Sequence, residues 1–507
     1  MKTQAYRLLP VVCFAVLACT FMPAQNSSAP VVIRESKHAL SPRLSDLAPA
    51  RINRASIAEA NSLLAAPVGS TSGLNFDGTL GTGYNYSDAT GTVGATQYVQ
   101  LVNLRYTIYN KTTGKVQRGP FAESALWKNF GGPCQTSPNG DGTVMYDQAA
   151  GRWVFQHHAE PVGGPYLNCV AVSTTSDATG TYYLYGFELT VNLPDIPKLA
   201  VWPDAYYIGQ NLLNPTTKSF IRAQACALDR SNMLLGNPAN AICFQGSPSM
   251  PTIWPVTLVG PTPPPVGSPE YFFQLDQRPG QGVNQMNEYV FHVDFVAPSN
   301  STYTPLVSFS VPAYKDSCAS ACVPQLDTTN IVKATGDRLT HPLVYRNFGD
   351  HESILLTHSV SMGKTPAMPS GIRWYEIRTP LTPVIYQSGT FAPDTNYRFI
   401  PSIGMDQMGD IAVGYTVSSA TMHPAIRYTG WTPADALGQM EAETSIMEGA
   451  GSQQAANPQW SNFSGMSVDP VDDCTFWYTN QYYAADSPNK WNTRIASFKF
   501  PGCFGNN

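Results

Sequence analysis

The chain has 507 residues, of which 13% are charged and 11% aromatic, with 40 glycines and 42 prolines. The formal net charge is −5 and no cluster of Lys and Arg occurs, which argues against nucleic acid or an anionic membrane surface as a partner. Few charges with many aromatic and turn residues favour an exported all-β protein over a helical one.

The first 24 residues have the pattern of an export signal. Lys2 and Arg7 precede the apolar run LLPVVCFAVLA, and small residues before Gln25 fit a cleavage site. We therefore predict a signal peptide over residues 1–24 and a secreted or periplasmic chain. VLAC, which ends at Cys19, is a loose lipoprotein box and leaves lipidation as the alternative. No later stretch offers the roughly 18 apolar residues that a transmembrane helix needs.

Eight cysteines remain after signal removal, and an even number in an exported chain predicts disulfides. Spacing alone does not fix the connectivity. We hypothesise that neighbours in the sequence pair, because each bond would then join one local β-unit. The expected pairs are Cys134 with Cys169, Cys226 with Cys243, Cys318 with Cys322, and Cys474 with Cys503. No Cys/His spacing is typical of zinc, and we predict no metal and no cofactor.

Residues 25–75 are rich in Ser, Ala and Pro and are predicted to be an N-terminal linker. Within them, SIAEANSLLAA has the composition of a short helix. From residue 76 to residue 507, short β-branched and aromatic runs alternate with Gly, Pro, Asn and Asp, which is the pattern of strands and turns. The main stretch with helical periodicity in that part is ADALGQMEAET.

A weak internal repeat runs through residues 76–507. One unit is a short apolar strand, a tight turn that often follows an Asp, a longer aromatic strand and a further strand. The clearest copies contain PSIGMDQMGDIAVGYTVSS and SGMSVDPVDDCTFWYTNQYY. In the C-terminal half, equivalent strand ends fall at Arg346, Asp406 and Asp469, which is a spacing of about 60 residues. This predicts a single β-propeller of roughly seven blades of four-stranded antiparallel sheet, with an array of two-sheet sandwiches as the alternative.

Several of these motifs also carry a resemblance to known proteins. The stretches GDGTVMYDQAAGRWV, GDHESILLTHSV, GIRWYEIR, SIGMDQMGDIAVGYTVSS and MSVDPVDDCTFWYTNQYY resemble a family of exported bacterial β-propeller-like proteins. The resemblance covers most of residues 95–505. It implies a secreted protein and a propeller fold, and it implies no activity and no catalytic residue.

The stretch YRNFGDHESILLTHSV gathers the most charge in a chain that is poor in it. A zinc-protease pattern would need a second histidine at position 355, which is Leu355. SILLTHSV has β-branched residues and is apolar on both faces, so we predict a strand between two neighbouring sheets. His358 is then expected to be a core or loop histidine.

Paired carboxylates are the chemistry that the sequence supports best, because glycosidases need an acid and a second carboxylate. Asp residues recur at strand ends, where they close turns through their side chains in most repeats: they are Asp147, Asp204, Asp406 and Asp469. Asp350 and Glu352 depart from the repeat, as does Arg346, which stands where other units have Asp. Departures from a repeat favour function, so we name Asp350, Glu352, His351 and Arg346 as candidate catalytic residues.

His157 and His158 form the other candidate, on the predicted strand RWVFQHHAE. Adjacent strand residues face opposite ways, so one of them at most faces a given cavity, and we name His158 as a candidate base. No G-x-S-x-G elbow occurs, although Ser, His and Asp partners distant in sequence stay possible.

Aromatic side chains can stack on sugar rings, although strand alternation sends half of each run into the packing between sheets. Candidate binding residues are Trp374, Tyr375, Arg373, Trp477 and Tyr482. They lie in the two runs IRWYEIR and FWYTNQYY.

Two functions remain open from the sequence. The first is a secreted, monomeric protein that binds extracellular carbohydrate or acts on it as a glycoside hydrolase or polysaccharide lyase, with polysaccharide as partner. The second is a non-catalytic propeller that serves as a scaffold at cell surfaces. An enzyme of the first kind predicts a pocket with two carboxylates about 5–10 Å apart. A scaffold predicts a filled central channel.

Overall fold

The computed structural model describes residues 28–49, 70–81, 83–189, 191–276, 285–317, 322–333, 335–363, 368–379 and 383–505. These residues are almost entirely strands and loops, which confirms the predicted all-β class. The described helices are short: α1 Pro133–Thr136, α2 Arg230–Leu235, and the 3-10 turns Leu44–Asp46, Glu123–Ala125 and Pro298–Asn300. No described helix is long and apolar enough to cross a membrane.

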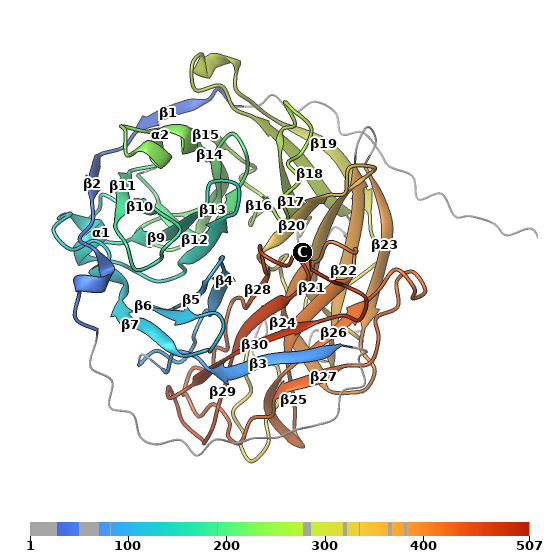
Figure 1. Ribbon diagram of the computed structural model, residues 1–507. Helices are drawn as coiled ribbons and strands as arrows, with labels where there is room; N and C mark the ends of the chain where they lie inside the picture. Colours follow the sequence, from blue (N-terminus) through green and yellow to red (C-terminus); the bar gives the residue numbers. More distant parts are fainter. Residues whose placement is uncertain are drawn as a thin grey trace, which may run out of the picture.

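Antiparallel sheets of consecutive strands make up the structure, and Figure 1 shows them arranged around a common centre. One sheet has the order β4 (Thr90–Val93), β5 (Gln97–Val102), β6 (Arg105–Asn110) and β7 (Val116–Ala122). Another has β8 (Thr143–Asp147), β9 (Arg152–Ala159), β10 (Leu167–Ser173) and β11 (Tyr182–Phe187). The next has β12 (Leu193–Val201), β13 (Tyr206–Leu213), β14 (Phe220–Leu228) and β15 (Asn240–Gln245).

An eight-stranded sheet follows along the chain. Its first half is β16 (Trp254–Leu258), β17 (Glu270–Leu275), β18 (Gln285–His292) and β19 (Thr302–Ser310). Its second half is β20 (Leu343–Asn347), β21 (Glu352–Ser361), β22 (Ser370–Thr379) and β23 (Val384–Phe391). The two halves are joined by a short parallel pairing of β16 with β20.

Two four-stranded sheets complete the set. One is β24 (Tyr397–Met405), β25 (Ile411–Ser419), β26 (Met422–Trp431) and β27 (Thr444–Met447). The other is β28 (Gly465–Val468), β29 (Phe476–Tyr482), β30 (Asn492–Lys499) and β3 (Thr71–Asp77). We call the strand that begins each of the consecutive runs β4–β7, β8–β11, β12–β15, β16–β19, β20–β23, β24–β27 and β28–β30 its first strand. These first strands contact one another in the order β4, β8, β12, β16, β20, β24, β28 and back to β4.

The N-terminal segment is part of the sheets. β1 (Val31–Arg34) pairs with β15, β2 (Lys37–Leu40) pairs with β11, and β3 pairs with β30 near the C-terminus. The described residues of the expected 25–75 linker therefore lie along sheet edges, which composition alone did not indicate. SIAEANSLLAA lies outside the described residues.

The strand over SILLTHSV is buried on both faces, as its sequence predicts. Ile354 and Leu356 pack into one hydrophobic core, and Leu355 between them packs into the next. By contrast, the helix expected for ADALGQMEAET is wrong. The stretch forms turns between β26 and β27, where Gly438 has a positive φ and donates its N–H to Gln387 Oε1.

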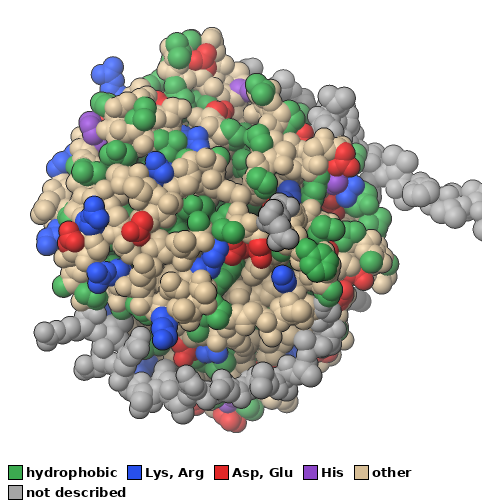
Figure 2. Space-filling view, in the orientation of Figure 1, with side chains coloured by type: hydrophobic (Ala, Val, Ile, Leu, Met, Phe, Trp, Pro, Cys, Tyr) green, Lys and Arg blue, Asp and Glu red, His purple; other side chains and the backbone are tan. Residues whose placement is uncertain are grey.

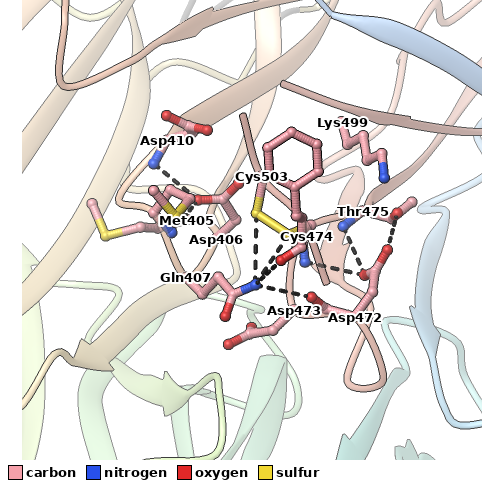
Figure 3. Close-up of a disulfide and its surroundings, with 12 residues drawn as sticks. Met405, Asp406, Gln407, Asp410, Asp472, Asp473, Cys474, Thr475, Lys499 and Cys503 are labelled. Carbon is pink, nitrogen blue, oxygen red and sulfur yellow. Dashed lines mark hydrogen bonds between the residues drawn. A yellow bond between two sulfur atoms is a disulfide. The ribbon is translucent and has the colours of Figure 1, made fainter. Parts of the chain in front are cut away.

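Three of the hypothesised disulfides are present: Cys134–Cys169, Cys226–Cys243 and Cys474–Cys503. The fourth pair involves Cys318, which lies outside the described residues. Figure 3 shows the Cys474–Cys503 bond, which ties the C-terminal tail to the turn after β28. Gln407 Nε2 lies against this bond, 3.2 Å from Cys474 Sγ, and donates to the Asp472 carbonyl at 3.2 Å.

Candidate functional site

An unusual backbone conformation recurs where the first strands begin. Non-glycine residues with positive φ occur two residues before three of the first strands, at Asp88, Asp141 and Thr252, and at the fourth residue of two more, at Ile196 in β12 and Ile400 in β24. This conformation is rare, above all for β-branched residues. In β12 and β24 the pairing register also shifts at this point, and such bulges re-aim side chains. The fold therefore directs side chains toward neighbouring strands at this end, which we call the strand-start end.

Asp141 is the electrostatic centre of the strand-start end. It is half-buried, and its backbone carbonyl accepts a hydrogen bond from Lys198 Nζ at 3.1 Å. Its negative charge acts on the titration of six neighbours: Tyr86, Asp88, Glu123, Asp195, Lys198 and Arg338. Together with Asp141, these groups come from the loops that lead into β4, β8 and β20, from β12 itself, and from the turn after β7. The fold therefore brings together residues that are distant in sequence.

Lys198 is fully buried, 0% exposed, and its ammonium group lies 3.5 Å from the centre of the Phe463 ring. Burial lowers the pKa of Lys198 to about 8, and the charges of Asp141, Asp88 and Asp195 limit that fall. Its hydrogen bond goes to a backbone carbonyl, so these carboxylates act on the buried cation through space.

Asp88 joins the beginning of β4 to the loop before β28. Its carboxylate accepts hydrogen bonds from Asn462 N at 2.6 Å, Ser461 Oγ at 3.1 Å and Asn103 Nδ2 at 3.2 Å. Burial and then the charge of Asp141 raise the pKa of Asp88 to about 7, against the effect of these donors. Asp88 is 2% exposed, so its role is to fix this end of the fold.

Asp195 and Arg338 are the half-buried members of the set, so they reach solvent as Asp141 does. Burial and then the charge of Asp141 raise the pKa of Asp195, whereas Arg338 and His158 act to lower it. Arg338 is held by a two-point ion pair with Asp337, at 2.7 and 2.8 Å. The charge of Asp141 raises the pKa of Asp195, and both carboxylates act on the guanidinium of Arg338; half-buried groups coupled in this way can exchange protons with a bound molecule.

Glu123 lies on the buried side of Asp141. Burial and the Asp141 charge raise the pKa of Glu123 to about 8, and its Oε1 is 3.8 Å from His157 Nδ1. Burial and the neighbouring His158 lower the pKa of His157 to about 3. Both groups are therefore neutral at pH 7, and this pair adds no charge to the site.

Of the sequence-predicted catalytic residues, His158 alone lies at the strand-start end. Its Nε2 donates to Glu160 Oε1 at 3.1 Å, and it is 2% exposed. Its charge acts on Asp195, as described above.

The other four lie at the opposite end of the first strands, around the turn between β20 and β21. Arg346 is buried and forms a two-point ion pair with Asp473, while its Nε donates to the Met405 carbonyl at 3.2 Å. The Asp350 side chain is 82% exposed and accepts from His351 Nδ1 at 2.8 Å, and Glu352 is buried at 6% exposure. The structure thus separates Asp350 from Glu352, one in solvent and one in the interior.

The sequence-predicted binding residues are mostly packed between sheets. Trp374 and Tyr375 are 0% exposed, and Tyr375 stacks on His358 with ring centres 5.8 Å apart. Arg373 Nε donates to Thr390 Oγ1 and Arg373 Nη1 to the Pro312 carbonyl at 3.2 Å. The Tyr482 hydroxyl donates to Asp77 Oδ1 at 3.0 Å. Trp477 is 3% exposed and lines a cavity at the edge of the last sheet.

The strand-end Asp residues close turns, as expected from their recurrence. Asp147 accepts from Ala150 N at 3.1 Å, Asp406 from Met408 N at 2.8 Å, and Asp469 from Val471 N at 2.9 Å. Asp204 instead accepts from the Tyr207 hydroxyl at 3.2 Å, and burial raises the pKa of Asp204 to about 6.

The central passage between the first strands is narrow, with a volume of about 60 Å³. Its described lining comes from six of the seven first strands, with Gly91, Val144, Leu258 and Met466 among the wall residues, and it includes no carboxylate. The charged groups therefore lie at the ends of the first strands and not along the passage. Figure 2 shows one face of the molecule, on which charged side chains are scattered and no single basic or acidic field is present.

Sequence reasoning missed Asp88, Asp141, Asp195, Lys198 and Arg338. Two signals were available. Lys198 is a lysine within the apolar strand segment KLAV, and Asp141 lies in NGDGT, a stretch that reads as an ordinary turn. Among the described residues, no group of three or more His, Cys, Asp and Glu side chains is arranged to hold a metal ion.

No protein-family model matches the chain, and no curated protein matches it in sequence. Among solved structures, a polysaccharide lyase of family PL25, an ulvan lyase bound to a sugar ligand, is 12% identical over 81% of this chain and 95% of its own, with a TM-score of 0.36. The endosialidase of phage phi92 is 7% identical over 84% and 69%, with a TM-score of 0.38. Semaphorin 1a of Drosophila is 8% identical over 86% and 90%, with a TM-score of 0.36. Overlaps of this size do not establish a shared function.

Proposed function

We propose that the sheets form a single seven-bladed β-propeller. The eight-stranded sheet then represents two blades, because among its described strands the two antiparallel halves pair only through the short β16/β20 ladder and otherwise pack against each other through side chains. The closed order of contacts among the seven first strands supports this architecture, as does the pairing of β3 with β30, which joins the two ends of the chain in one sheet. The proposal agrees with the resemblance to exported propeller-like proteins.

We propose that the chain is exported, with cleavage after Ala24, and acts outside the cytoplasm as a monomer. The three disulfides support this location, because disulfides persist in oxidising compartments. Mass spectrometry of the mature N-terminus distinguishes cleavage after Ala24 from lipidation at Cys19.

We propose that the protein is a carbohydrate-active enzyme whose reaction centre is the strand-start end. The observation that carries this proposal is that Asp141 and Asp195 are half-buried carboxylates, that the charge of Asp141 raises the pKa of Asp195, and that both charges act on Arg338. The raised pKa of Asp195 suits a general acid, and Asp141 is the second carboxylate. In a hydrolase, Asp195 protonates the glycosidic oxygen as the bond to the anomeric carbon breaks, while Asp141 takes a proton from the attacking water or attacks that carbon itself.

The same groups suit a polysaccharide lyase. There a base removes the proton next to a uronate carboxylate, and a cation such as Arg338 neutralises that carboxylate while the glycosidic bond breaks. The products separate the two reactions: a hydrolase releases a saturated sugar, and a lyase releases an unsaturated uronate that absorbs ultraviolet light.

The test is a screen of plant, algal, fungal and bacterial polysaccharides with the mature protein, followed by variants. Asp141→Asn and Asp195→Asn are expected to lower kcat by about 10²–10⁴-fold, which is the usual contribution of acid–base groups. Asp350→Asn and Glu352→Gln carry the matched change at the opposite end of the first strands. If those two variants lose activity and the first two keep it, the reaction centre lies at the β20–β21 turn.

A non-catalytic scaffold is the second candidate. The specific observation in its favour is that Trp374, Tyr375 and Tyr482 are buried and the central passage is narrow, so neither offers a broad sugar-stacking surface. A scaffold predicts that no polysaccharide in the screen is cleaved and that Asp141→Asn alters stability alone.

A further inference from the structure

A second cavity lies at the edge of the last sheet, beside the turn that follows the end of β28, on the side of the molecule where the first strands end. It has a volume of about 360 Å³, which is in the range of small-molecule sites. Its walls come from β3, the turn after β6, the turn between β28 and β29, and strands β29 and β30. Its polar lining residues include Lys111, Lys499, Asp469, Thr71, Ser72 and Thr112.

The Asp469 carboxylate in this cavity is fully occupied. Its Oδ1 accepts from Lys111 Nζ at 2.9 Å and from Val471 N at 2.9 Å, and its Oδ2 accepts from Trp477 Nε1 at 3.4 Å. Asp469 therefore positions Lys111 and Trp477 and offers little to a bound molecule. Trp477 is 3% exposed and stacks on Tyr98 with ring centres 5.3 Å apart, so it forms a rigid wall.

The second nearby carboxylate is occupied in the same way. Asp472 accepts from Cys474 N at 3.1 Å, Thr475 N at 3.0 Å and Thr475 Oγ1 at 2.6 Å. Although burial opposes it, these donors and the charge of Lys499 lower the pKa of Asp472, so it is ionised. Figure 3 shows Lys499 beside this turn, with no dashed line joining its ammonium group to another drawn residue.

The cavity therefore combines one satisfied carboxylate, Asp469, with ammonium groups that still have hydrogen-bond donors to give, and Asp472 lies beside it in the same turn. A lysine ammonium has three donors, and Lys111 uses one of them on Asp469. Lys499 makes no ion pair within 4 Å among the described residues. The exposed hydroxyls of Thr71, Ser72 and Thr112 in the wall add neutral donors and acceptors.

We propose that this cavity binds a polyhydroxylated carboxylate, that is, a uronate, with Lys499 and Lys111 on its carboxylate and the Thr and Ser hydroxyls on its ring hydroxyls. The uronate is either a free sugar acid or one residue of an acidic polysaccharide. This site lies away from Asp141 and Asp195, and its binding does not depend on the reaction proposed for them.

The experiment is calorimetric titration of the mature protein with glucuronic acid, with a glucuronate-containing oligosaccharide, and with glucose as the neutral match. Lys499→Gln, which keeps the side-chain length and removes the charge, is expected to weaken uronate binding at least tenfold. Ser72→Trp, which fills the cavity without changing its charge, is expected to do the same. Lys490→Gln, an exposed lysine between β29 and β30, is the control and leaves binding unchanged.

Equal affinity for the acid and the oligosaccharide identifies a free sugar acid as the ligand, and a tenfold preference for the oligosaccharide identifies a polymer. Absence of binding by both uronates, binding of glucose as tight as that of glucuronic acid, or unchanged affinity in Lys499→Gln and Ser72→Trp overturns the proposal. Asp141→Asn is expected to bind uronate normally, so a failed reaction centre and a failed cavity give different results.

Discussion

The charged side chains at the two ends of the first strands are arranged differently: one end has separate ion pairs, and the other has a set of groups that act on one another. At the β20–β21 turn, Arg346 is matched by Asp473 and Asp350 by His351, so the charges are settled in local pairs. At the strand-start end, Asp141 acts on six titratable neighbours, and several of them have shifted pKa values. Charges that are paired individually stabilise a fold, whereas charges that are coupled can move protons. The density of charged residues in the sequence therefore indicated the β20–β21 turn as the reaction centre, whereas the coupling between titratable groups indicates the strand-start end.

The largest expected effect breaks a pair at the β20–β21 end. Arg346→Met leaves the Asp473 carboxylate buried and without its partner, so we expect the free energy of unfolding to fall by about 3–5 kcal/mol. Urea unfolding of the mature protein measures it.

The double variant Arg346→Met, Asp473→Asn removes both charges and is its control. We expect it to recover much of the loss, because no charge is then left buried alone. If the free energy of unfolding of Arg346→Met lies within about 1 kcal/mol of that of the unchanged protein, Asp473 does not depend on Arg346 for a partner.

The next effect concerns pH at the strand-start end. The pKa of Glu123 is raised to about 8 in the folded chain, whereas an unfolded Glu titrates near its ordinary value. The folded state therefore binds a proton that the unfolded state has lost, and stability falls as pH rises from about 4.5 to about 8.

In Glu123→Gln this contribution disappears. We expect the loss of stability between pH 5 and pH 8 to shrink by on the order of 2–4 kcal/mol relative to the unchanged protein. Thermal unfolding at the two pH values measures the difference. An identical pH dependence in the variant contradicts a protonated Glu123.

Removal of the Cys474–Cys503 disulfide tests how much the stability of the protein depends on the covalent link between the C-terminal tail and the turn after β28. The double variant Cys474→Ser, Cys503→Ser opens a link with a sequence separation of 29 residues and is expected to lose about 2–4 kcal/mol. Native mass spectrometry checks that the other disulfides persist. Retention of full stability would show that the sheet pairing of β3 with β30 suffices.

The smallest effect is expected at Asp350. Its side chain is exposed, and its bond to His351, which lowers the pKa of Asp350, is screened by water. Asp350→Asn is expected to leave the urea-unfolding midpoint unchanged and to change any polysaccharide-cleaving activity by less than twofold. A larger loss of activity would return the reaction centre to the β20–β21 turn.

The sequence predicted what depends on local patterning. Apolar residues on both faces of SILLTHSV indicated a strand between two cores, neighbouring cysteines indicated their pairing, and recurring Asp residues indicated turns. The candidate site depends on contacts that are remote in the sequence. Lys198 reaches the carbonyl of Asp141 across 57 positions, and Asp88 accepts from Ser461 across 373.

No pattern within one repeat shows such contacts, because they form only when sheets close around a common centre. Glycine, proline and Asp spacing showed where each turn lies, but not that positive-φ positions recur where the first strands begin. The helix expected for ADALGQMEAET failed for the same reason: the stretch makes contacts with the neighbouring sheet, such as the hydrogen bond from the Gly438 backbone N–H to Gln387 Oε1.

The most direct test of the account is a carbon-13 NMR titration of the Asp195 carboxyl and the Lys198 ε-carbon in the mature protein and in Asp141→Asn. The Asp141 charge acts on both groups, so its removal is expected to lower both pKa values, that of Asp195 because repulsion is lost and that of Lys198 because attraction is lost. Asp350→Asn is expected to move neither. If both pKa values stay unchanged in Asp141→Asn, the strand-start end is a set of separate pairs and the proposed reaction centre is wrong.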